Sequence, residues 1–283
     1  MRSELDLAAL PPLREALAAE GLRADKRFGQ HFLFDLNLCR KIARLAGDLD
    51  GAAVVEVGPG PGGLTRALLE AGARVLAIEA DPRFVPILEA LGAAAPGRLT
   101  VIQADALAAD EPTLLASAEL PAHALVVSNL PYNVGTPLFV KWLTGTWRPA
   151  GMTLMFQKEV AQRIVAAPGS DAYGRLSVLA QAVSAVGLVL EAPARAFTPP
   201  PKVDSAVVRA VPRPERPDDR LLAALETVTA AAFGQRRKML RSSLRGLGGE
   251  PLCLAAGLAP DARAETIDIP GFLRLAQAWL ARA

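Results

Sequence analysis

The sequence predicts an α/β fold, in which an open, mostly parallel sheet is flanked by helices and followed by a small α-helical C-terminal domain. Short apolar runs alternate with amphipathic segments from residue 51 to about residue 210. A glycine-rich turn at 58–63 joins the first apolar run to a helical pattern. Beyond the proline-rich segment 211–217, only helical periodicity remains. These three observations define the fold class.

Composition narrows the possible functions. The chain has 283 residues, 51% of them hydrophobic, which is ample for a large core. Its 31 Lys and Arg against 29 Asp and Glu give a net charge of +2, so any nucleic-acid contact must come from local basic patches. Two distant Cys and two His argue against disulfide scaffolds and zinc sites. This scarcity of Cys and His leads us to expect a metal-free protein. Because no signal peptide or membrane span is recognisable, we expect it to be cytoplasmic.

The pattern divides into three ranges. We expect an N-terminal helical segment over 1–50, an α/β domain over 51–210 and a small helical domain over 218–283. The first range contains a short helix within 5–20 and a second helix over 36–46, which Asp35 caps and Gly47 ends. Between these helices, residues 24–35 combine bases and aromatic rings, which indicates either a ligand-contacting segment or a loop whose Phe residues fill the core.

The first two strands carry features of a nucleotide site. A strand over 52–57 leads into the glycine turn and a helix over 64–70, an arrangement that lets backbone approach an anionic group. A second strand over 74–79 ends in Glu79, about 20 residues after the first glycine, the spacing of a carboxylate that accepts ribose hydroxyls. The pattern fits nicotinamide, flavin and S-adenosylmethionine ligands alike. A turn that merely closes a tight strand-to-helix connection is the alternative.

The next two strands end in further polar groups. A strand over 99–103 leads to Asp105, and one over 123–127 leads to Asn129. The Asn129 amide oxygen and a backbone carbonyl beside Pro131 can accept the hydrogens of a ring amine, while Tyr132 can stack on the ring. Because ligands bind beyond the carboxyl ends of parallel strands, we expect these groups to converge with the glycine turn.

The rest of the α/β domain continues the alternation. We expect helices over 137–143, 157–164 and 175–184, and strands over 152–156, 187–190 and 203–210. Three consecutive prolines at 199–201 make a stiff connection beside Phe197. Phe197 either stacks on a base opposite Tyr132 or fills the core.

The C-terminal range is helical and locally basic. A helix over 221–233 precedes a segment over 235–245 with five bases, at Arg236, Arg237, Lys238, Arg241 and Arg245. In a chain of near-neutral charge, such a cluster indicates phosphate contacts. A solvated helical face is the alternative.

Several motifs in this order resemble those of the ribosomal RNA adenine dimethyltransferases, over nearly the whole chain. They are Gly29-Gln30-His31-Phe32-Leu33, Glu56-Val57-Gly58-Pro59-Gly60, Ile78-Glu79, Asp105, Asn129-Leu130-Pro131-Tyr132-Asn133, Gln157-Lys158-Glu159-Val160, Tyr173-Gly174-Arg175-Leu176-Ser177, Phe197-Thr198-Pro199-Pro200-Pro201-Lys202-Val203-Asp204-Ser205 and Phe233-Gly234-Gln235-Arg236-Arg237-Lys238. The resemblance implies a Rossmann-like class I S-adenosylmethionine-dependent methyltransferase fold. It is greatest to the small-subunit branch, whose members dimethylate two adjacent adenines in the 3′-terminal hairpin loop of 16S rRNA and take part in ribosome biogenesis. The sister branch, which methylates large-subunit rRNA and confers macrolide resistance, usually has Ile at the position of Leu130.

The resemblance also implies roles for individual residues. The methyl donor would lie among His31, Leu33, Gly58, Gly60, Glu79, Asp105 and Asn129. The catalytic group would be Asn129, Leu130, Pro131 and Tyr132. RNA and the target base would contact Phe197, Lys202, Arg236, Arg237, Lys238 and Arg241. No metal is implied, and His31 departs from the family's usual Asn.

Other classes of protein share parts of this pattern. A dinucleotide-dependent oxidoreductase would explain the glycine turn and Glu79, but neither the Asn129 motif nor the Phe197 motif. A non-catalytic ribosome-assembly factor could retain the nucleotide site, and a DNA adenine methyltransferase would use similar chemistry. The prediction is an S-adenosylmethionine-dependent rRNA adenine dimethyltransferase that acts as a monomer on 16S rRNA in the small ribosomal subunit.

Overall fold

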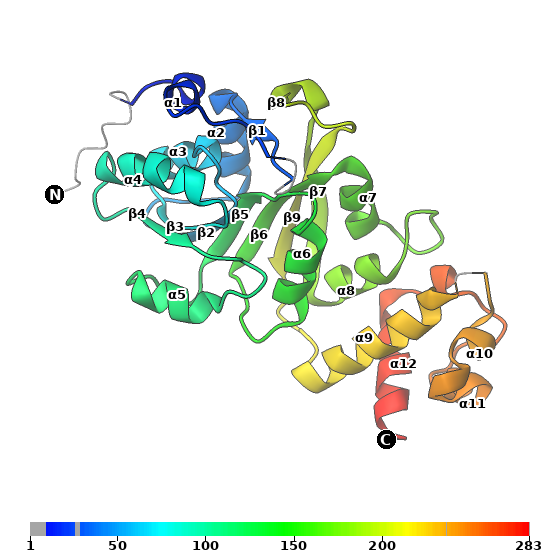
Figure 1. Cartoon of the computed structure of the whole chain (residues 1–283). Coiled ribbons are helices and arrows are strands. Elements are labelled where there is room, and N and C mark those ends of the chain that lie inside the picture. The colour runs from blue at the N-terminus through cyan, green and yellow to red at the C-terminus, as the bar shows by residue number, and fades with distance from the viewer. Residues whose placement is uncertain (1–9, 26–28, 236, 283) are drawn as a thin grey trace. The chain divides into compact units, whose positions relative to one another are not determined.

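The structure, a computed structural model, describes residues 10–25, 29–235 and 237–282 (Figure 1). The start of the predicted N-terminal helix, residues 5–9, lies outside these described residues. The described part of that segment forms α1, Leu13–Ala19, which begins directly after Pro12. A proline at this position is compatible with a helix start, since its missing N–H is not needed there.

A seven-stranded sheet forms the centre of the fold, in the order β4-β3-β2-β5-β6-β9-β7. Within it, β2 pairs in parallel with β3 and β5, β3 with β4, and β5 with β6. The strands are β2 (Ala53–Val57), β3 (Arg74–Glu79), β4 (Leu99–Gln103), β5 (Leu125–Asn129), β6 (Gly151–Gln157), β7 (Ser184–Ala192) and β9 (Ser205–Pro212). Every residue of β2 is buried, as expected for a central parallel strand covered on both faces.

Helices connect these strands (Figure 1). They are α2 (Leu36–Leu45), α3 (Gly63–Glu70), the 3₁₀ turn η3 (Pro82–Phe84), α4 (Val85–Ala93), α5 (Glu111–Ser117), α6 (Gly135–Thr144), α7 (Lys158–Val165) and α8 (Arg175–Val183). One apolar cluster joins Ile42 of α2 and Leu68 of α3 to Val54 and Val75 of the sheet. This packing fixes the turn between β2 and α3.

A second, two-stranded sheet ties the N-terminal segment to a distant part of the chain. In this sheet β1 (Phe32–Leu33) pairs antiparallel with β8 (Phe197–Thr198), so that Leu33 faces Phe197 across the ladder. The 3₁₀ turn η4 (Ala194–Ala196) precedes β8. This sheet is not predictable from the sequence pattern, because strands of two residues have no readable period.

The C-terminal part is helical, as its periodicity predicts. It contains α9 (Asp219–Gly234), α10 (Leu240–Ser243), η5 (Arg245–Leu247), α11 (Gly249–Ala255), η6 (Ala264–Thr266) and α12 (Ile269–Leu280). Helices α9 and α12 pack against each other, and Phe233 stacks on Phe272 with ring centroids 5.4 Å apart. The buried Tyr173 hydroxyl donates to the Ile267 carbonyl at 2.9 Å, which anchors the segment before α8 to this helical core.

The chain folds into two compact units. The first comprises the described residues up to Phe139 with Trp147–Ala161 and Leu188–Arg209. The second comprises Val140–Thr146, Gln162–Gly187 and the described residues from Ala210 onward. The ranges 1–50, 51–210 and 218–283 stay a prediction, because a compact unit need not fold or act independently.

Helices long and apolar enough to cross a membrane do not occur in the described part of the chain.

Candidate functional site

A pocket opens at the carboxyl edge of the parallel strands, in the first unit. Its walls come from β1 and the segment before it, from the end of β2 and the turn that follows, and from the ends of β3, β4 and β5 with the loops after them. Ten predicted site residues line it, namely His31, Leu33, Gly58, Gly60, Glu79, Asp105, Asn129, Leu130, Pro131 and Tyr132. The strand ends therefore converge as the sequence analysis expects.

An added side-chain atom would meet close neighbours at three glycines of the turn. Gly58 has φ +66°, and a Cβ on it would lie 3.0 Å from the Pro131 ring. A Cβ on Gly60 would lie 3.3 Å from the Phe32 ring. A Cβ on Gly63, the first residue of α3, would collide with the Leu33 carbonyl oxygen. These glycines let the turn, β1 and the Asn129 loop meet around one space.

Glu79 holds the turn in place from the end of β3. Its Oε2 accepts from the Gly60 N–H at 2.9 Å, and its Oε1 accepts from the Asp81 N–H at 2.8 Å. Burial raises the pKa of Glu79 above its ordinary value, although these backbone bonds oppose the shift. Each carboxylate oxygen has a second lone pair, so both retain capacity for ligand hydroxyls.

Glu56 is a pocket residue to which the sequence analysis assigned no role. It lies in β2 just before the glycine turn, is only 2% exposed, and its Oε2 has no hydrogen-bond partner among the described residues. Burial, reinforced by the nearby Glu79 charge, raises its pKa to about 8. A single acidic residue inside an otherwise apolar strand was the signal that could have identified it.

The Asn129 side chain is oriented by the N-terminal segment. Its Nδ2 donates to the His31 carbonyl at 3.3 Å, so its Oδ1 remains as the acceptor. Two backbone carbonyls follow Asn129 in the loop. That of Pro131 accepts from Val134 and Gly135 at 3.1 and 3.0 Å, where α6 begins.

The Tyr132 side chain is held by a hydrogen bond of its hydroxyl and by a contact with the His31 ring. Its hydroxyl and the Ser205 hydroxyl, at the start of β9, are 2.5 Å apart. The His31 and Tyr132 ring centroids lie 5.3 Å apart with an interplanar angle of 34°. Burial raises the Tyr132 pKa, so the phenol stays protonated near neutral pH. The ring is therefore a neutral, fixed surface at the pocket.

His31 joins two walls of the pocket. Its Nδ1 lies 2.8 Å from the Pro199 carbonyl oxygen. Because a carbonyl oxygen can only accept, the proton of this bond belongs to Nδ1. The proline-rich loop is thus connected to the N-terminal segment through the ring as well as through the pairing of β1 with β8.

The remaining predicted contacts lie away from the pocket lining. Phe197 is 3% exposed and packs in the apolar cluster with Leu33 and Cys39. Stacking on a base would require this ring to leave the core, so that role stays a prediction. Lys202 is exposed in the loop that follows the three prolines.

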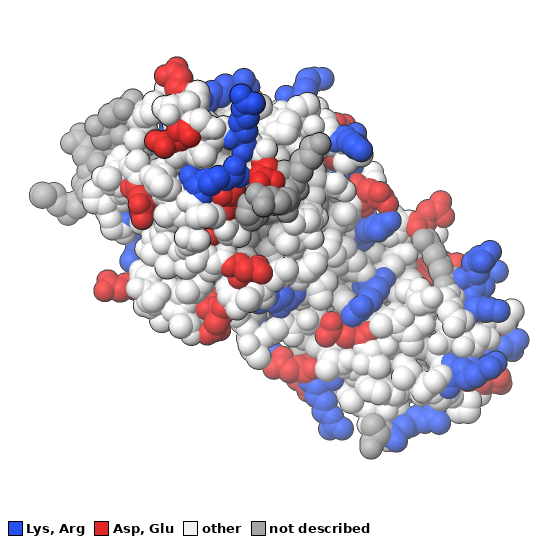
Figure 2. Space-filling view, viewed as in Figure 1, with Lys and Arg blue, Asp and Glu red and all other residues white. Residues whose placement is uncertain are grey.

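The basic segment in the second unit is not one continuous helix. It passes through a turn before α10, and Arg237, Lys238 and Arg241 are all exposed. Arg236 lies outside the described residues. Figure 2 shows Lys and Arg side chains gathered over the region that Figure 1 labels α10 and α11. This exposure is compatible with phosphate contacts and equally with a solvated face.

Within the described ranges, no group of three or more His, Cys, Asp and Glu side chains could hold a metal ion. Both cysteines are free and buried.

Comparison with known proteins identifies the family. The model of the ribosomal RNA adenine dimethylase family matches residues 21–279. Ribosomal RNA small subunit methyltransferase A of Phenylobacterium zucineum is 67% identical over 278 residues, covering 98% of this chain and 96% of the relative. The protein of the same name from Caulobacter vibrioides is 64% identical over 260 residues, covering 92% and 99% of the two chains.

Solved structures share the fold. A dimethyladenosine transferase from Plasmodium falciparum superposes with a TM-score of 0.71 at 24% identity, over 87% of this chain and 96% of that one. The 23S rRNA methyltransferase ErmE superposes with a TM-score of 0.66 at 28% identity, over 87% and 98%. The predicted fold class, the Rossmann-like α/β fold of class I methyltransferases, is thereby confirmed. From its motifs, its fold and the match to nearly its whole length, the chain belongs to the ribosomal RNA adenine dimethylase family.

Proposed function

We propose that this protein transfers methyl groups from S-adenosylmethionine to N6 of two adjacent adenines in the 3′-terminal hairpin loop of 16S rRNA, within the small ribosomal subunit. The observation that carries the proposal is the pocket in which the Asn129 loop meets the glycine turn, Glu79 and Asp105. A donor site and an amine-accepting site thus share one space. The names of the relatives, small subunit methyltransferase A, favour this RNA over the large-subunit alternative.

The residues around the pocket fit this donor. At Gly58 and Gly60 an added Cβ would lie close to a neighbouring ring, and without one the backbone can approach a ligand next to the start of α3. Glu79 retains acceptor capacity for ribose hydroxyls, and exposed Asp105 suits an adenine amine. The unpartnered Oε2 of Glu56 can accept from a buried cationic amine. When bound, the donor supplies an electrophilic methyl group on a sulfonium centre.

Asn129 and the carbonyl after it would prepare the acceptor. The exocyclic adenine nitrogen is a weak nucleophile because its lone pair is delocalised into the ring. Hydrogen bonds from its two hydrogens to the Asn129 Oδ1 and to a backbone carbonyl would favour a more tetrahedral, reactive nitrogen. Of the two carbonyls in the loop, that of Pro131 already accepts from Val134 and Gly135, so we assign this role to Leu130.

The fixed Tyr132 ring would hold the extruded adenine by stacking on its face. Phe197 is proposed as a second contact for the base. Since the amine becomes acidic as it is alkylated, the residues around it need not include a strong general base. Phosphate contacts are proposed for Lys202 and for the exposed bases of the second unit, Arg237, Lys238 and Arg241, together with Arg236.

Three further properties belong to this proposal. The protein would act as a monomer, and it would act in the cytoplasm because its substrate is the ribosomal subunit. The ranges 51–210 and 218–283 would act as the methyltransferase domain and the RNA-contacting domain, and 1–50 as the segment that completes the donor site. Light scattering during size-exclusion chromatography tests the monomer directly.

The experiment is transfer of radiolabelled methyl from S-adenosylmethionine to small ribosomal subunits that lack the modification, followed by nucleoside analysis. Dimethyladenosine in 16S rRNA is the expected product. Label in large-subunit rRNA or DNA instead would support the methyl-transfer reaction but overturn the proposed substrate. Donor binding without transfer to any nucleic acid would favour a non-catalytic assembly factor.

A further inference from the structure

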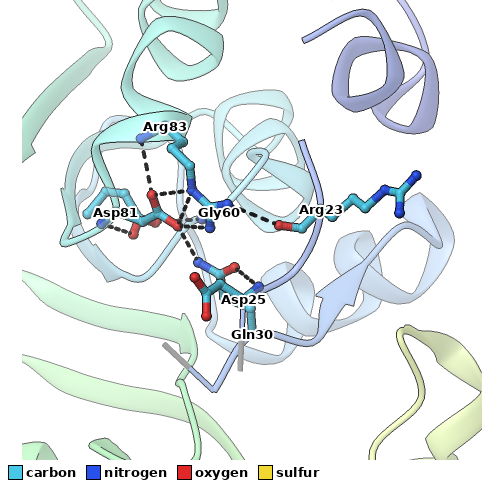
Figure 3. Close-up of polar contacts among 7 residues, drawn as sticks. Arg23, Asp25, Gln30, Gly60, Asp81 and Arg83 are labelled. Carbon is cyan, nitrogen blue, oxygen red and sulfur yellow. Dashed lines mark hydrogen bonds and ion pairs between the residues drawn. The ribbon is translucent and has the colours of Figure 1, made fainter. Parts of the chain in front are cut away.

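Two side chains tie the N-terminal segment to the turn that follows β3 (Figure 3). The Gln30 Nε2 donates to the Asp81 Oδ2 at 2.8 Å, while its Oε1 accepts from the Asp25 N–H at 2.8 Å. The Arg83 Nη1 donates to the Arg23 carbonyl at 3.4 Å. These contacts join segments 51 to 60 residues apart in the sequence. Ordering these polar side chains costs conformational entropy, so we looked for what the contacts achieve.

Asp81 is the centre of this connection. It is 1% exposed, and a carboxylate so buried destabilises the fold unless it is paired and hydrogen-bonded. Arg83 donates to both of its oxygens, with Nη2 to Oδ2 at 2.5 Å and Nε to Oδ1 at 2.9 Å. Although burial opposes it, the bonds from Arg83 and Gln30 hold the Asp81 pKa below its usual range. Gln30 is thus a partner of a buried charge.

The connection leads directly to the predicted donor site. The Asp81 N–H donates to Glu79 Oε1, and the other oxygen of Glu79 accepts from Gly60 in the glycine turn. A continuous series of hydrogen bonds therefore runs from Gln30 through Asp81 and Glu79 to Gly60, as Figure 3 shows in part. A shift at Gln30 would be transmitted to the carboxylate proposed to hold the ribose.

The residue after Gln30 reaches the other side of the pocket. The His31 carbonyl accepts from the Asn129 amide, and the His31 ring contacts the Pro199 carbonyl. Two consecutive residues thus contact the end of β3, the end of β5 and the proline-rich loop. This short segment therefore adds contacts among three parts of the chain that are distant in sequence.

We propose that Gln30 is a positioning residue for methyl-donor binding, which acts through Asp81 to fix Glu79 and the N-terminal wall of the pocket. This inference rests on the proposed function. Gln30 does not touch the reacting atoms in this scheme. It determines how tightly the donor is held, while Asn129, Leu130 and Tyr132 determine the rate of transfer from the bound donor.

The test compares Gln30→Met and Gln30→Glu with the wild-type protein. Methionine keeps the length and approximate volume of the side chain but can make neither hydrogen bond, whereas glutamate places a second carboxylate against Asp81. The control is Arg40→Met on the surface of α2. It removes the ion pair in which Arg40 Nε lies 2.7 Å from Glu70 Oε2. Calorimetry with S-adenosylmethionine gives the donor Kd, and methyl transfer to unmodified small subunits gives KM and kcat.

We expect Gln30→Met to weaken donor binding about tenfold, the effect of one lost hydrogen bond to a charged group, and Gln30→Glu to weaken it further. The kcat at saturating donor should stay within about threefold of the wild-type value, because the transfer groups are intact. Arg40→Met should leave both the donor Kd and kcat unchanged. Thermal unfolding of each variant establishes that it is folded.

Wild-type donor affinity within about twofold in folded Gln30→Met would overturn the inference while leaving the proposed function intact. So would a fall in kcat without a change in Kd, because it would place Gln30 in the transfer step. Wild-type protein that does not bind S-adenosylmethionine at all would overturn the proposed function itself.

Discussion

Asn129 shows how one hydrogen bond can decide the role of a side chain. Its amide could present either its oxygen or its nitrogen to the pocket, and only the oxygen can accept from an adenine amine. The contact between Nδ2 and the His31 carbonyl selects the oxygen. The chemistry proposed at Asn129 therefore depends on the N-terminal segment, which lies 98 residues earlier in the chain.

Asn129→Ala should separate binding from transfer. We expect the rate of methyl transfer to fall about 100-fold, because the nitrogen loses one of two acceptors, while the donor Kd rises less than about tenfold. Single-turnover transfer and calorimetry measure the two effects. Asn37→Ala, on the exposed start of α2, is the control. Unchanged turnover in Asn129→Ala would remove this residue from the mechanism.

Glu56 should make stability depend on pH in an unusual direction. Its pKa is raised from 4.5 to about 8 in the folded protein. Between these values the folded state binds a proton that the unfolded chain has released, so the free energy of unfolding falls as pH rises through this window. The stabilisation that comes from the raised Glu56 pKa is fully present below the pKa of the unfolded chain and is lost above about pH 8.

Glu56→Gln should remove this contribution. Urea unfolding from about pH 5 to about pH 8 should show wild-type stability declining relative to the variant by on the order of 3 kcal/mol. Glu79, whose pKa is also raised, is present in both proteins, so the difference between them reports Glu56 together with its coupling to Glu79. Glu89→Gln, at an exposed position of α4, serves as the control. Parallel pH profiles for the wild type and Glu56→Gln would contradict the assignment.

At the scale of elements, the sequence predicted those parts of the site that rest on a period or on turn chemistry. The ends of β3 and β4 and the glycine turn lie where alternation and strand-to-helix spacing place them. The strand before Asn129 was set two residues too early, because Ser128 and Asn129 are polar yet belong to β5. Ser128 is buried, with its hydroxyl bonded to the Val57 carbonyl, a long-range partner that composition does not reveal.

Long-range contacts account for the rest of what the sequence did not show. The pairing of β1 with β8 and the Gln30 to Asp81 bond each join residues far apart in the chain. Neither leaves a local pattern, since a lone amide or a two-residue strand has no periodicity to read. The burial of Phe197 is of the same kind, because its rigid proline flank fits both a base contact and a core position.

Packing of α3 against β1 should be sensitive to a single methyl group. In Gly63→Ala the new Cβ would collide with the Leu33 carbonyl, and backbone cannot move aside as a flexible side chain can. We expect a loss of about 2 kcal/mol in stability and weaker donor binding. Thermal unfolding and calorimetry measure these effects. Gly187→Ala in β7, where a Cβ meets nothing within 4 Å, is the matched control, and equal behaviour of the two variants would contradict the packing argument.

For the molecule as a whole, charge is informative only through its distribution. With a net charge of +2, the protein has no general attraction to RNA, so binding must depend on where its bases gather. The exposed bases around α10 offer such a place. These bases should control affinity for the ribosomal subunit, whereas the pocket residues should control affinity for the donor.

Replacing Arg237, Lys238 and Arg241 together by Gln should weaken binding to small ribosomal subunits without changing the donor Kd. If each base neutralises one phosphate, fewer counterions are released on binding, and the slope of log affinity against log salt should become shallower by about 3. Filter binding at a series of salt concentrations measures this slope. A control with Lys41, Arg44 and Arg220 replaced has the same net charge, and all three positions are exposed elsewhere. Equal slopes for the two triple variants would mean that the basic segment is a solvated face, because only a local contact distinguishes proteins of identical net charge.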